Sequence, residues 1–325
     1  MDPMTATGAY RFCVQTHLFN VDRFILPMLD NCGPHVERIY VARSERPWRY
    51  NEKYRDLVVN QTPASILDES KWRDKIVLIE DEWSADEDQR NACLARAKAD
   101  GMDYMVVQDA DEYLTHRDYA ANLAAVAANP DYDAYMMDCM IFWKSTEYIM
   151  RNRFGGDLDV DKKLFVLNCN TDVTFYDMRS VNEAACNVCP DLLPGLMYHL
   201  SYVMSDEELH KKLSVWGHTN DFDWATWYNE KWLKWYESRR LLGLRKGRSW
   251  ARAKRYSGEL PEVLDDFNNP EVTRYSPGLK EWLSNQVCGL ALLAYYRWFR
   301  MPGRRLRRRL GLDKERFKQS RQMFP

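Results

Sequence analysis

The most constraining stretch of this chain is an apolar run that ends in three carboxylates. Tyr104–Leu114 reads YMVVQDADEYL, and Val106 and Val107 have the β-branched side chains of a buried strand. Carboxylates at the end of a buried strand repel one another and lose hydration. A hard cation such as Mg²⁺ or Mn²⁺ would relieve that repulsion. The D-x-D pair of Asp109 and Asp111 therefore indicates either a metal site or a polar turn with solvated acids.

The residues before this run predict an α/β unit. Lys75–Glu80 has the pattern of a short strand, and Ser84 with Glu87 has the form of a capping box. A helix is then expected to pass through Lys98 and to stop at Gly101. In open α/β sheets, ligands bind beyond the carboxyl ends of the strands. The D-x-D acids occupy that place in the predicted order of strand, helix and strand.

The rest of the chain continues the alternation of strands and helices. Strands are predicted at 12–16, 38–42, 134–142 and 163–168, and helices at 21–31 and 119–129. The length of 325 residues, of which 46% are hydrophobic, allows one large α/β domain and a smaller helical part. We place the larger domain at 1–236 and a basic, mainly helical extension at 237–325.

Several positions before the D-x-D pair complete a recognisable pattern: Gln89, Arg90, Asn91, Ala97, Gly101 and Tyr104. With the D-x-D pair they resemble the family-2 type of GT-A glycosyltransferase, over about residues 12 to 235. The resemblance implies a GT-A (Rossmann-like) mixed sheet flanked by helices. It also implies transfer of a sugar from a nucleotide-diphosphate sugar, UDP-linked in the first instance, to an acceptor hydroxyl.

The same resemblance implies a metal site and contacts to the donor. Asp111 and His199 would ligate Mn²⁺ or Mg²⁺, and Asp109 would hold the ribose or a metal-bound water. Arg90 and Asn91 would lie near the sugar and the diphosphate. His199 stands in a Y-H-x-S-Y sequence that is also similar to N-acetylglucosaminyltransferase relatives of this fold. A histidine without such a context is more often structural.

Further donor contacts are expected from strand ends and from the later part of the chain. Thr16 and Glu45 follow the first two predicted strands and would contact the nucleobase or the ribose. Lys212, with Lys211 beside it, would offset the charge of the leaving group unless both lysines are solvated. His218 would face the acceptor or the diphosphate.

Glu183 is the first candidate for the catalytic base, and Asp177 is the second. The resemblance places a V-H-E element near the acceptor, and Val181-Asn182-Glu183 stands in that position with Asn in place of His. An inverting transferase needs a carboxylate to take the proton of the attacking hydroxyl. The alternative is a structural role, in which Glu183 packs against the protein or pairs with an arginine.

Two other functions compete with this interpretation. A nucleotidyltransferase of related fold would also use paired acids and a metal, but it would carry a Gly-rich phosphate loop after the first strand. That position reads THLFN at 16–20. A non-enzymatic protein that binds nucleic acid or a membrane surface would fit the basic end of the chain, and its acids would then be structural.

Charge is distributed unevenly along the sequence. Residues 239–325 hold 21 Lys and Arg against 8 Asp and Glu, although the whole chain has a net charge of −2. Aromatic residues such as Trp250 and Trp298 lie among these cations. Such a composition suits a hydroxylated base in DNA, an anionic lipid or glycolipid, or a solvated helix face.

Localisation and the tryptophans complete the expectations. The first ten residues lack the apolar core of a signal peptide, and the eight cysteines show no secreted framework, so we expect a cytoplasmic protein, peripheral at DNA or a membrane.

A tryptophan group would stack on a sugar or a base, or would pack the helical part, and its spacing favours packing. This group is Trp224, Trp227, Trp232 and Trp235.

Overall fold

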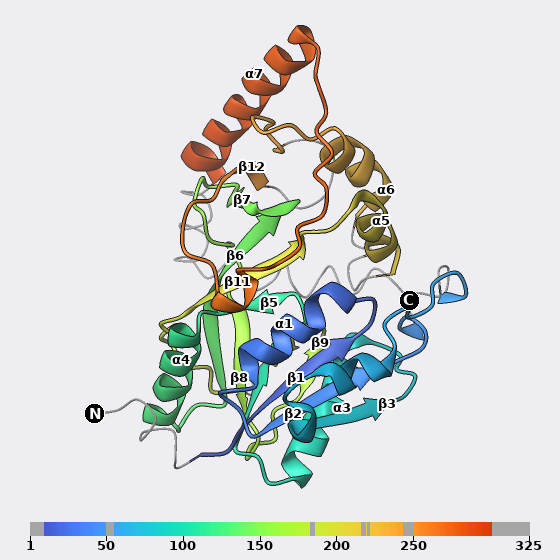
Figure 1. The fold of residues 1–325 in the computed structure, drawn as a ribbon. Helices are drawn as coiled ribbons and strands as arrows, with labels where there is room; N and C mark the ends of the chain where they lie inside the picture. Colours follow the sequence, from blue (N-terminus) through green and yellow to red (C-terminus); the bar gives the residue numbers. More distant parts are fainter. Residues whose placement is uncertain are drawn as a thin grey trace, which may run out of the picture.

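The computed structural model describes most of the chain. The described residues are 10–49, 55–182, 186–215, 219, 222–242 and 250–300. Of these, residues 299 and 300 are described by their backbone only. Within these ranges, a single ten-stranded mixed sheet runs through the molecule, with helices on its faces (Figure 1). The predicted α/β, Rossmann-like class with a mixed sheet is confirmed.

The first part of the sheet is parallel. β1 (Phe12–Leu18) lies between β2 (Arg38–Arg43) and β4 (Tyr104–Val107), and β3 (Ile76–Glu80) pairs with β2 at the edge. All these pairs are parallel, so the carboxyl ends of the four strands meet at one edge of the sheet. This edge is where the D-x-D acids emerge.

The second part of the sheet is mainly antiparallel. Its order from β4 outward is β8, β6, β7 and β12, each antiparallel to its neighbour. β11 pairs with β6 in parallel and with β5 in antiparallel, and β9 and β10 form a separate hairpin. The bounds are β5 (Glu112–Tyr113), β6 (Ala134–Trp143), β7 (Ser145–Asn152), β8 (Lys163–Asn168), β9 (Phe175–Asp177), β10 (Ser180–Val181), β11 (Leu196–Tyr202) and β12 (Trp250–Arg255).

Helices cover both faces of this sheet, and one further helix lies beyond its end. Figure 1 shows α1, α3 and α4 around the parallel strands, and α7 at the opposite end beyond β7 and β12. The helices are α1 (Asp22–Cys32), α3 (Asp86–Ala99), α4 (His116–Ala128), α5 (Asp206–Val215), α6 (Trp224–Trp227) and α7 (Leu279–Tyr295). Short 3₁₀ helices are η4 (Ala64–Glu69), η5 (Arg73–Lys75) and η7 (Glu262–Leu264), and short π-helices are η6 (Tyr228–Leu233) and η8 (Tyr296–Arg300). The boundary expected near residue 236 stays a prediction, although β12 beyond it pairs with β7.

The core lies on both faces of the central strands. Along β1, Val14 belongs to one apolar cluster and Cys13 to the other, and both are fully buried. On β4, Val106 and Val107 divide in the same way. Strands covered on both faces carry continuous apolar runs, and this explains why the YMVV segment shows no polar alternation.

The tryptophans pack the core rather than line the cavity described below. Trp227, Trp232 and Trp235 are at most 1% exposed, and Trp224 is partly buried against the same cluster. The ring of Trp143 lies within 4.9 Å of the Trp232 ring, centroid to centroid, in an edge-to-face arrangement. The packing role that their spacing favours is therefore the one they have.

A capping box forms at the start of α5, and the one predicted at Ser84 does not form. At the start of α5, the Ser205 backbone N–H donates to Glu208 Oε2 at 2.7 Å, and the Glu208 N–H donates to Ser205 Oγ at 3.2 Å. The box predicted at Ser84 is wrong, because α3 begins at Asp86 and its N-cap is Ala85, with no side-chain cap bond. Three acids in the first turn of α3 favour its start through the helix dipole instead.

Replacing Ser205 by Ala is expected to lower the free energy of unfolding by about 1 kcal/mol, because the cap of α5 loses its side-chain acceptor. The matched control is Ser84→Ala, which removes a serine from a sequence of the same form without a cap bond. Urea denaturation followed by circular dichroism measures both. Equal losses in the two variants would contradict the assignment.

Candidate active site

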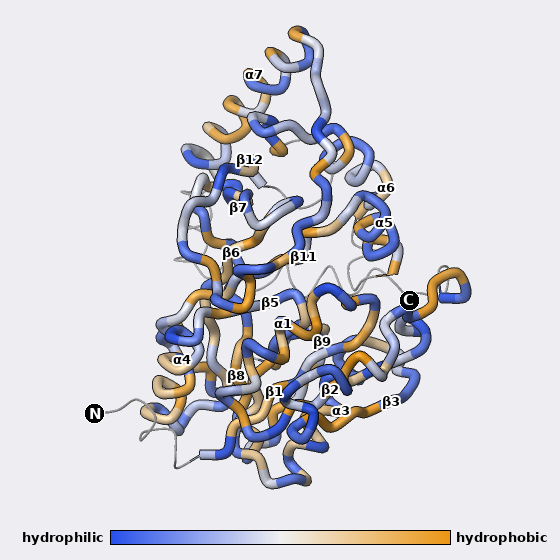
Figure 2. The backbone as a smooth tube through the Cα atoms, viewed as in Figure 1, coloured by the Kyte–Doolittle hydropathy of each residue, from blue (hydrophilic) through white to orange (hydrophobic). Residues whose placement is uncertain are grey.

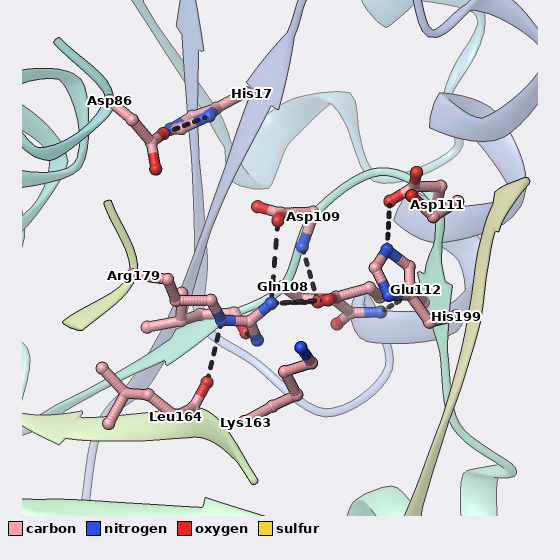
Figure 3. A network of polar contacts seen from close by, with 12 residues as sticks. His17, Asp86, Gln108, Asp109, Asp111, Glu112, Lys163, Leu164, Arg179 and His199 are labelled. Carbon is pink, nitrogen blue, oxygen red and sulfur yellow. Dashed lines mark hydrogen bonds and ion pairs between the residues drawn. The ribbon is translucent and has the colours of Figure 1, made fainter. Parts of the chain in front are cut away.

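The D-x-D acids lie in the turn that connects β4 to β5. Gln108 N–H donates to the Gln15 carbonyl of β1 at 3.2 Å, and Glu112 N–H donates to the Asp109 carbonyl at 3.0 Å. These bonds keep the turn at the carboxyl edge of the parallel strands. The two carboxylates of the pair then face different groups, as Figure 3 shows.

Asp109 is directed toward two arginines. Its Oδ1 lies 2.9 Å from Arg90 Nη2, and its Oδ2 lies 3.6 Å from Arg179 Nη1. Arg90 is itself held by Asp86, with 3.0 Å between Nε and Oδ2. Burial alone would raise the pKa of Asp109, but Arg90 and Arg179 hold it well below its usual range. Asp109 is therefore a carboxylate whose charge is balanced within the protein.

Asp111 faces a different pair of cations. Lys212 Nζ donates to its Oδ2 at 2.8 Å, and His199 Nε2 lies 3.4 Å from its Oδ1. Burial alone would lower the pKa of His199, but the Asp111 carboxylate raises it to about 10. Burial would likewise raise the pKa of Asp111, and Lys212 and His199 keep it well below its usual range.

The sheet explains why these distant residues meet. In the antiparallel pair of β5 and β11, His199 stands opposite Glu112, and the Leu200 N–H donates to the Asp111 carbonyl at 2.7 Å. α5 follows β11 and returns Lys212 to the same turn, where its ammonium also donates to Ser201. Strand pairing thus places His199 at one carboxylate oxygen of Asp111, and α5 brings Lys212 to the other.

Glu112, the third acid of the run, is a buried structural group. Its carboxylate is 1% exposed and accepts from Arg179 Nη1 at 2.5 and 2.6 Å. It also accepts from the Asp109 N–H at 3.0 Å, and Arg179 Nε donates to the Leu164 carbonyl of β8 at 2.9 Å. Figure 3 shows Arg179 between Asp109, Glu112 and Leu164. Arg179 therefore joins the D-x-D turn to the neighbouring strand.

His17 lies at the end of β1, on the other side of Asp109. Its Nδ1 is 3.3 Å from Asp86 Oδ1, and its ring lies 6.4 Å from the Trp48 ring in an edge-on arrangement. Burial of the ring, together with the charge of Arg90, lowers the pKa of His17 to about 4. The imidazole is therefore neutral at pH 7.

A cavity of about 290 Å³ opens against the D-x-D turn. Both cations and an aromatic pair line it. The residues on which the argument relies are His17, Trp48, Asp109, Asp111, Arg23, Lys211 and Lys212. Lys211 pairs with Glu207 at 3.0 Å, and Arg23 pairs with Glu208 at 2.9 Å.

Other residues expected at the donor site lie elsewhere. Asn91 Nδ2 donates to the Phe175 carbonyl at 2.8 Å, and the Phe175 N–H donates back to its Oδ1 at 2.9 Å. Asn91 thus holds β9 against α3. Thr16 is fully buried inside the sheet, and Glu45 Oε1 accepts from Arg43 at 2.5 Å. None of these three residues lines the cavity.

The candidate bases divide between described and undescribed residues. Asp177 ends β9 and stands opposite Ser180 in the hairpin, and it does not line the cavity. Glu183 and His218 lie outside the described residues. Their roles stay predictions.

The D-x-D turn offers a pair of metal ligands rather than a complete shell. Among the described residues, no three His, Cys, Asp or Glu side chains are grouped to hold a metal ion. Asp111 Oδ1 and His199 Nε2 lie 3.4 Å apart, and once the imidazole gives up its proton they are an oxygen and a nitrogen ligand of the kind that Mn²⁺ accepts. Mg²⁺ and similar ions are often held by one or two protein carboxylates with substrate phosphates. The pair fits that mode of binding.

Sequence reasoning missed Arg179, His17, Asp86 and Trp48. Arg179 lies in an irregular stretch after β9, and nothing in its neighbourhood marks it as a partner of Glu112. The sequence did contain a signal for His17. It follows the predicted Thr16 near the end of the first strand, and because side chains alternate between the two faces of a strand, His17 points to the face opposite Thr16.

No family model matches this sequence, and no curated protein matches it. Among solved structures, the chain is similar to the crystal structure of mannose-1-phosphate geranyltransferase from Thermus thermophilus, with 14% identity and a TM-score of 0.28. The match covers 50% of this chain and 51% of that chain, so the chain spans about half of that protein. The fold class follows from the strand order and pairing, not from this match.

Proposed function

We propose that this protein is a glycosyltransferase that uses a nucleotide-diphosphate sugar. The observation that carries the proposal is the D-x-D turn at the carboxyl edge of four strands, open to a cavity that holds Lys211, Lys212 and Arg23. Ligands of open α/β sheets bind at this edge. Asp22, Asp109, Asp111 and Glu208 line the same cavity, so a diphosphate would be bound by these cations together with a divalent metal ion.

The residues that line the cavity suggest how the donor lies. The diphosphate would lie near Lys211 and Lys212, whose charges offset the negative charge that develops on the leaving nucleotide. The nucleoside would lie toward Trp48 and His17, which offer an aromatic surface and a neutral imidazole. We infer UDP as the first nucleotide to test.

Asp111 and His199 would hold Mn²⁺ or Mg²⁺, which supplies Lewis-acid stabilisation of the diphosphate when bound. Asp109, which Arg90 and Arg179 hold in place, would orient the ribose through its carboxylate oxygens. The Lys212 ammonium keeps the Asp111 side chain turned toward the cavity. These assignments are independent of the acceptor.

Acceptor activation requires a carboxylate near the acceptor hydroxyl. Glu183 remains our proposal for this base in an inverting reaction, and Asp177 is the second candidate. The acceptor classes are a saccharide or glycolipid and a hydroxylated base in DNA. Replacing each acid by its amide and measuring transfer against donor hydrolysis would separate a base from a structural acid.

Donor binding is the first test. A nucleoside diphosphate at about 100 times its Kd should add about 2.7 kcal/mol to the free energy of unfolding. We expect UDP or another diphosphate, with Mn²⁺, to raise the Tm of the full chain, and the nucleoside alone to leave it unchanged. Nucleotide sugars with the same base should act like the diphosphate.

Two lysines provide a matched pair for this test. Lys211→Met removes a cation of the cavity and should reduce the shift, whereas Lys71→Met removes an exposed lysine that pairs with Asp30 at 3.2 Å outside the cavity. No shift with any nucleotide on a folded protein would overturn the proposal. Release of pyrophosphate from a nucleoside triphosphate and a sugar phosphate would replace it with nucleotidyl transfer.

A further inference from the structure

Helix α7 turns polar side chains toward the body of the protein. Glu281 Oε1 lies 3.2 Å from Arg239 Nη1. Asn285 exchanges two hydrogen bonds with the backbone of Arg240, at 2.8 and 2.9 Å, and Gln286 accepts from the Arg240 Nε at 3.0 Å. The helix is therefore attached through hydrogen bonds and an ion pair rather than through apolar packing.

The contact is also close. Gly289 faces Arg240, and a Cβ at this position would lie 2.5 Å from the Arg240 Cβ. Of the 17 residues of α7, only Gly289 is buried. Leu292 and Leu293, one turn later, are half-buried.

The opposite face of α7 is apolar and faces outward. Leu283, Val287 and Leu290 are 48%, 66% and 51% exposed. Ala291 and Ala294 are exposed on the same face. Figure 2 shows hydrophobic positions recurring along α7, which lies at the end of the molecule. A helix on the surface of a water-soluble domain has the reverse arrangement, with its apolar stripe toward the core.

The C-terminal end of the helix carries residues that favour a lipid–water boundary. Tyr295 and Trp298 are 52% and 75% exposed, and aromatic side chains of this kind prefer the interface between lipid and water. Trp282 lies on the inward face, where its Nε1 donates to Ser238 Oγ at 3.1 Å. Lys280 and Arg297 are exposed beside the apolar face. In the sequence, a run of basic residues, RRLRRR at 304–309, follows closely.

We propose that α7 lies flat on an anionic membrane surface, with Leu283, Val287 and Leu290 in the lipid and the neighbouring cations on the headgroups. An apolar helix face bordered by Lys and Arg binds membranes through buried apolar area and attraction to anionic lipid. Among the described residues, no helix is long and apolar enough to cross a bilayer. Surface docking is thus the mode that α7 allows.

Charge and apolarity together select this partner. Nucleic acid would meet the cations, but it gains nothing from aliphatic side chains such as Leu283 and Val287. A second copy of the chain would bring the same cations to the interface, and like charges placed opposite each other weaken association. The proposal rests on α7 and on the basic residues that follow it, and it does not depend on the nucleotide site.

The test is flotation of the full chain with vesicles. We expect the protein to float with vesicles of phosphatidylcholine and phosphatidylglycerol, to float much less with phosphatidylcholine alone, and to be released by salt. The triple variant L283Q/V287Q/L290Q should lose binding by about tenfold or more, because three apolar contacts with lipid are removed. Replacing the arginines at 304, 305, 307, 308 and 309 by Gln should remove the preference for anionic vesicles.

A matched triple variant controls for lost exposed apolar area. L57Q/V59Q/L192Q replaces three aliphatic residues that are 78%, 45% and 40% exposed on other parts of the surface, and it should bind as the parent does. The proposal would be overturned by a parent that floats with neither vesicle, or by equal binding of the two triple variants. It would also be overturned if the α7 variant changed only the oligomeric state or only the binding of duplex DNA.

Discussion

Replacing Asp111 by Asn is expected to lower kcat/KM for sugar transfer by about 100- to 1,000-fold. The amide keeps the shape of the side chain but removes the charge that faces His199 and Lys212. A metal held by Asp111 would lose its anionic ligand, and the diphosphate would lose the group that orients the cation. The measurement is the steady-state rate with saturating Mn²⁺, together with the Mn²⁺ concentration that gives half of the maximal rate.

The control for this variant is another carboxylate paired with a lysine. Asp157 is 38% exposed in its side chain and lies 2.5 Å from Lys254, and it does not line the cavity. Asp157→Asn should therefore leave kcat/KM within about threefold, since exposed pairs contribute little. Full activity of folded Asp111→Asn, with an unchanged response to Mn²⁺, would remove Asp111 from the proposed site.

Local patterns in the sequence were sufficient for the parallel strands. The YMVV run predicted β4, and Gly101, where the predicted helix stops, has a φ of 70° that glycine adopts without strain. The resemblance to family-2 glycosyltransferases placed Asp111 and His199 at one metal site, with Lys212 as a donor contact. Their contact required the pairing of β5 with β11, which no local pattern encodes.

Other features depended on contacts over long sequence separations. Asn91 stands in a helix next to Arg90, yet only Arg90 reaches the D-x-D turn, because Asn91 lies on the part of α3 that faces β9. The capping pattern at Ser84 was too short to exclude a start one residue later. The resemblance to family-2 glycosyltransferases remains an expectation about function, while the mixed sheet that it implied is present.

The basic C-terminal part shows the same limit. Its composition pointed to an anionic partner, but it did not reveal which face of α7 meets the protein. Asn285 and Gln286 face inward because the backbone carbonyls of Ser238 and Arg240 accept hydrogen bonds from them. The apolar face is exposed as a consequence.

Replacing Arg179 by Met is expected to lower the free energy of unfolding by about 3 to 5 kcal/mol, because it leaves the Glu112 carboxylate buried and unpaired. Glu112 would keep only the Asp109 N–H as a donor. The carbonyls of Leu164 and Val107 would also lose the bonds from the guanidinium. Guanidinium chloride denaturation, followed by tryptophan fluorescence, measures the change.

An exposed ion pair is the control that distinguishes the effect of burying a charge from the effect of losing a charge pair. Arg73 Nε lies 2.7 Å from Asp68, and the two side chains are 52% and 65% exposed, so Arg73→Met should cost at most about 1 kcal/mol. If the buried charge is the cause, the double variant E112Q/R179M should be more stable than R179M alone, because the remaining side chain is neutral. A double variant as unstable as the sum of both single changes would mean that Arg179 acts through its carbonyl contacts. The D-x-D turn would then be held through the bonds of Arg179 to the carbonyls of Leu164 and Val107 rather than through its ion pair with Glu112.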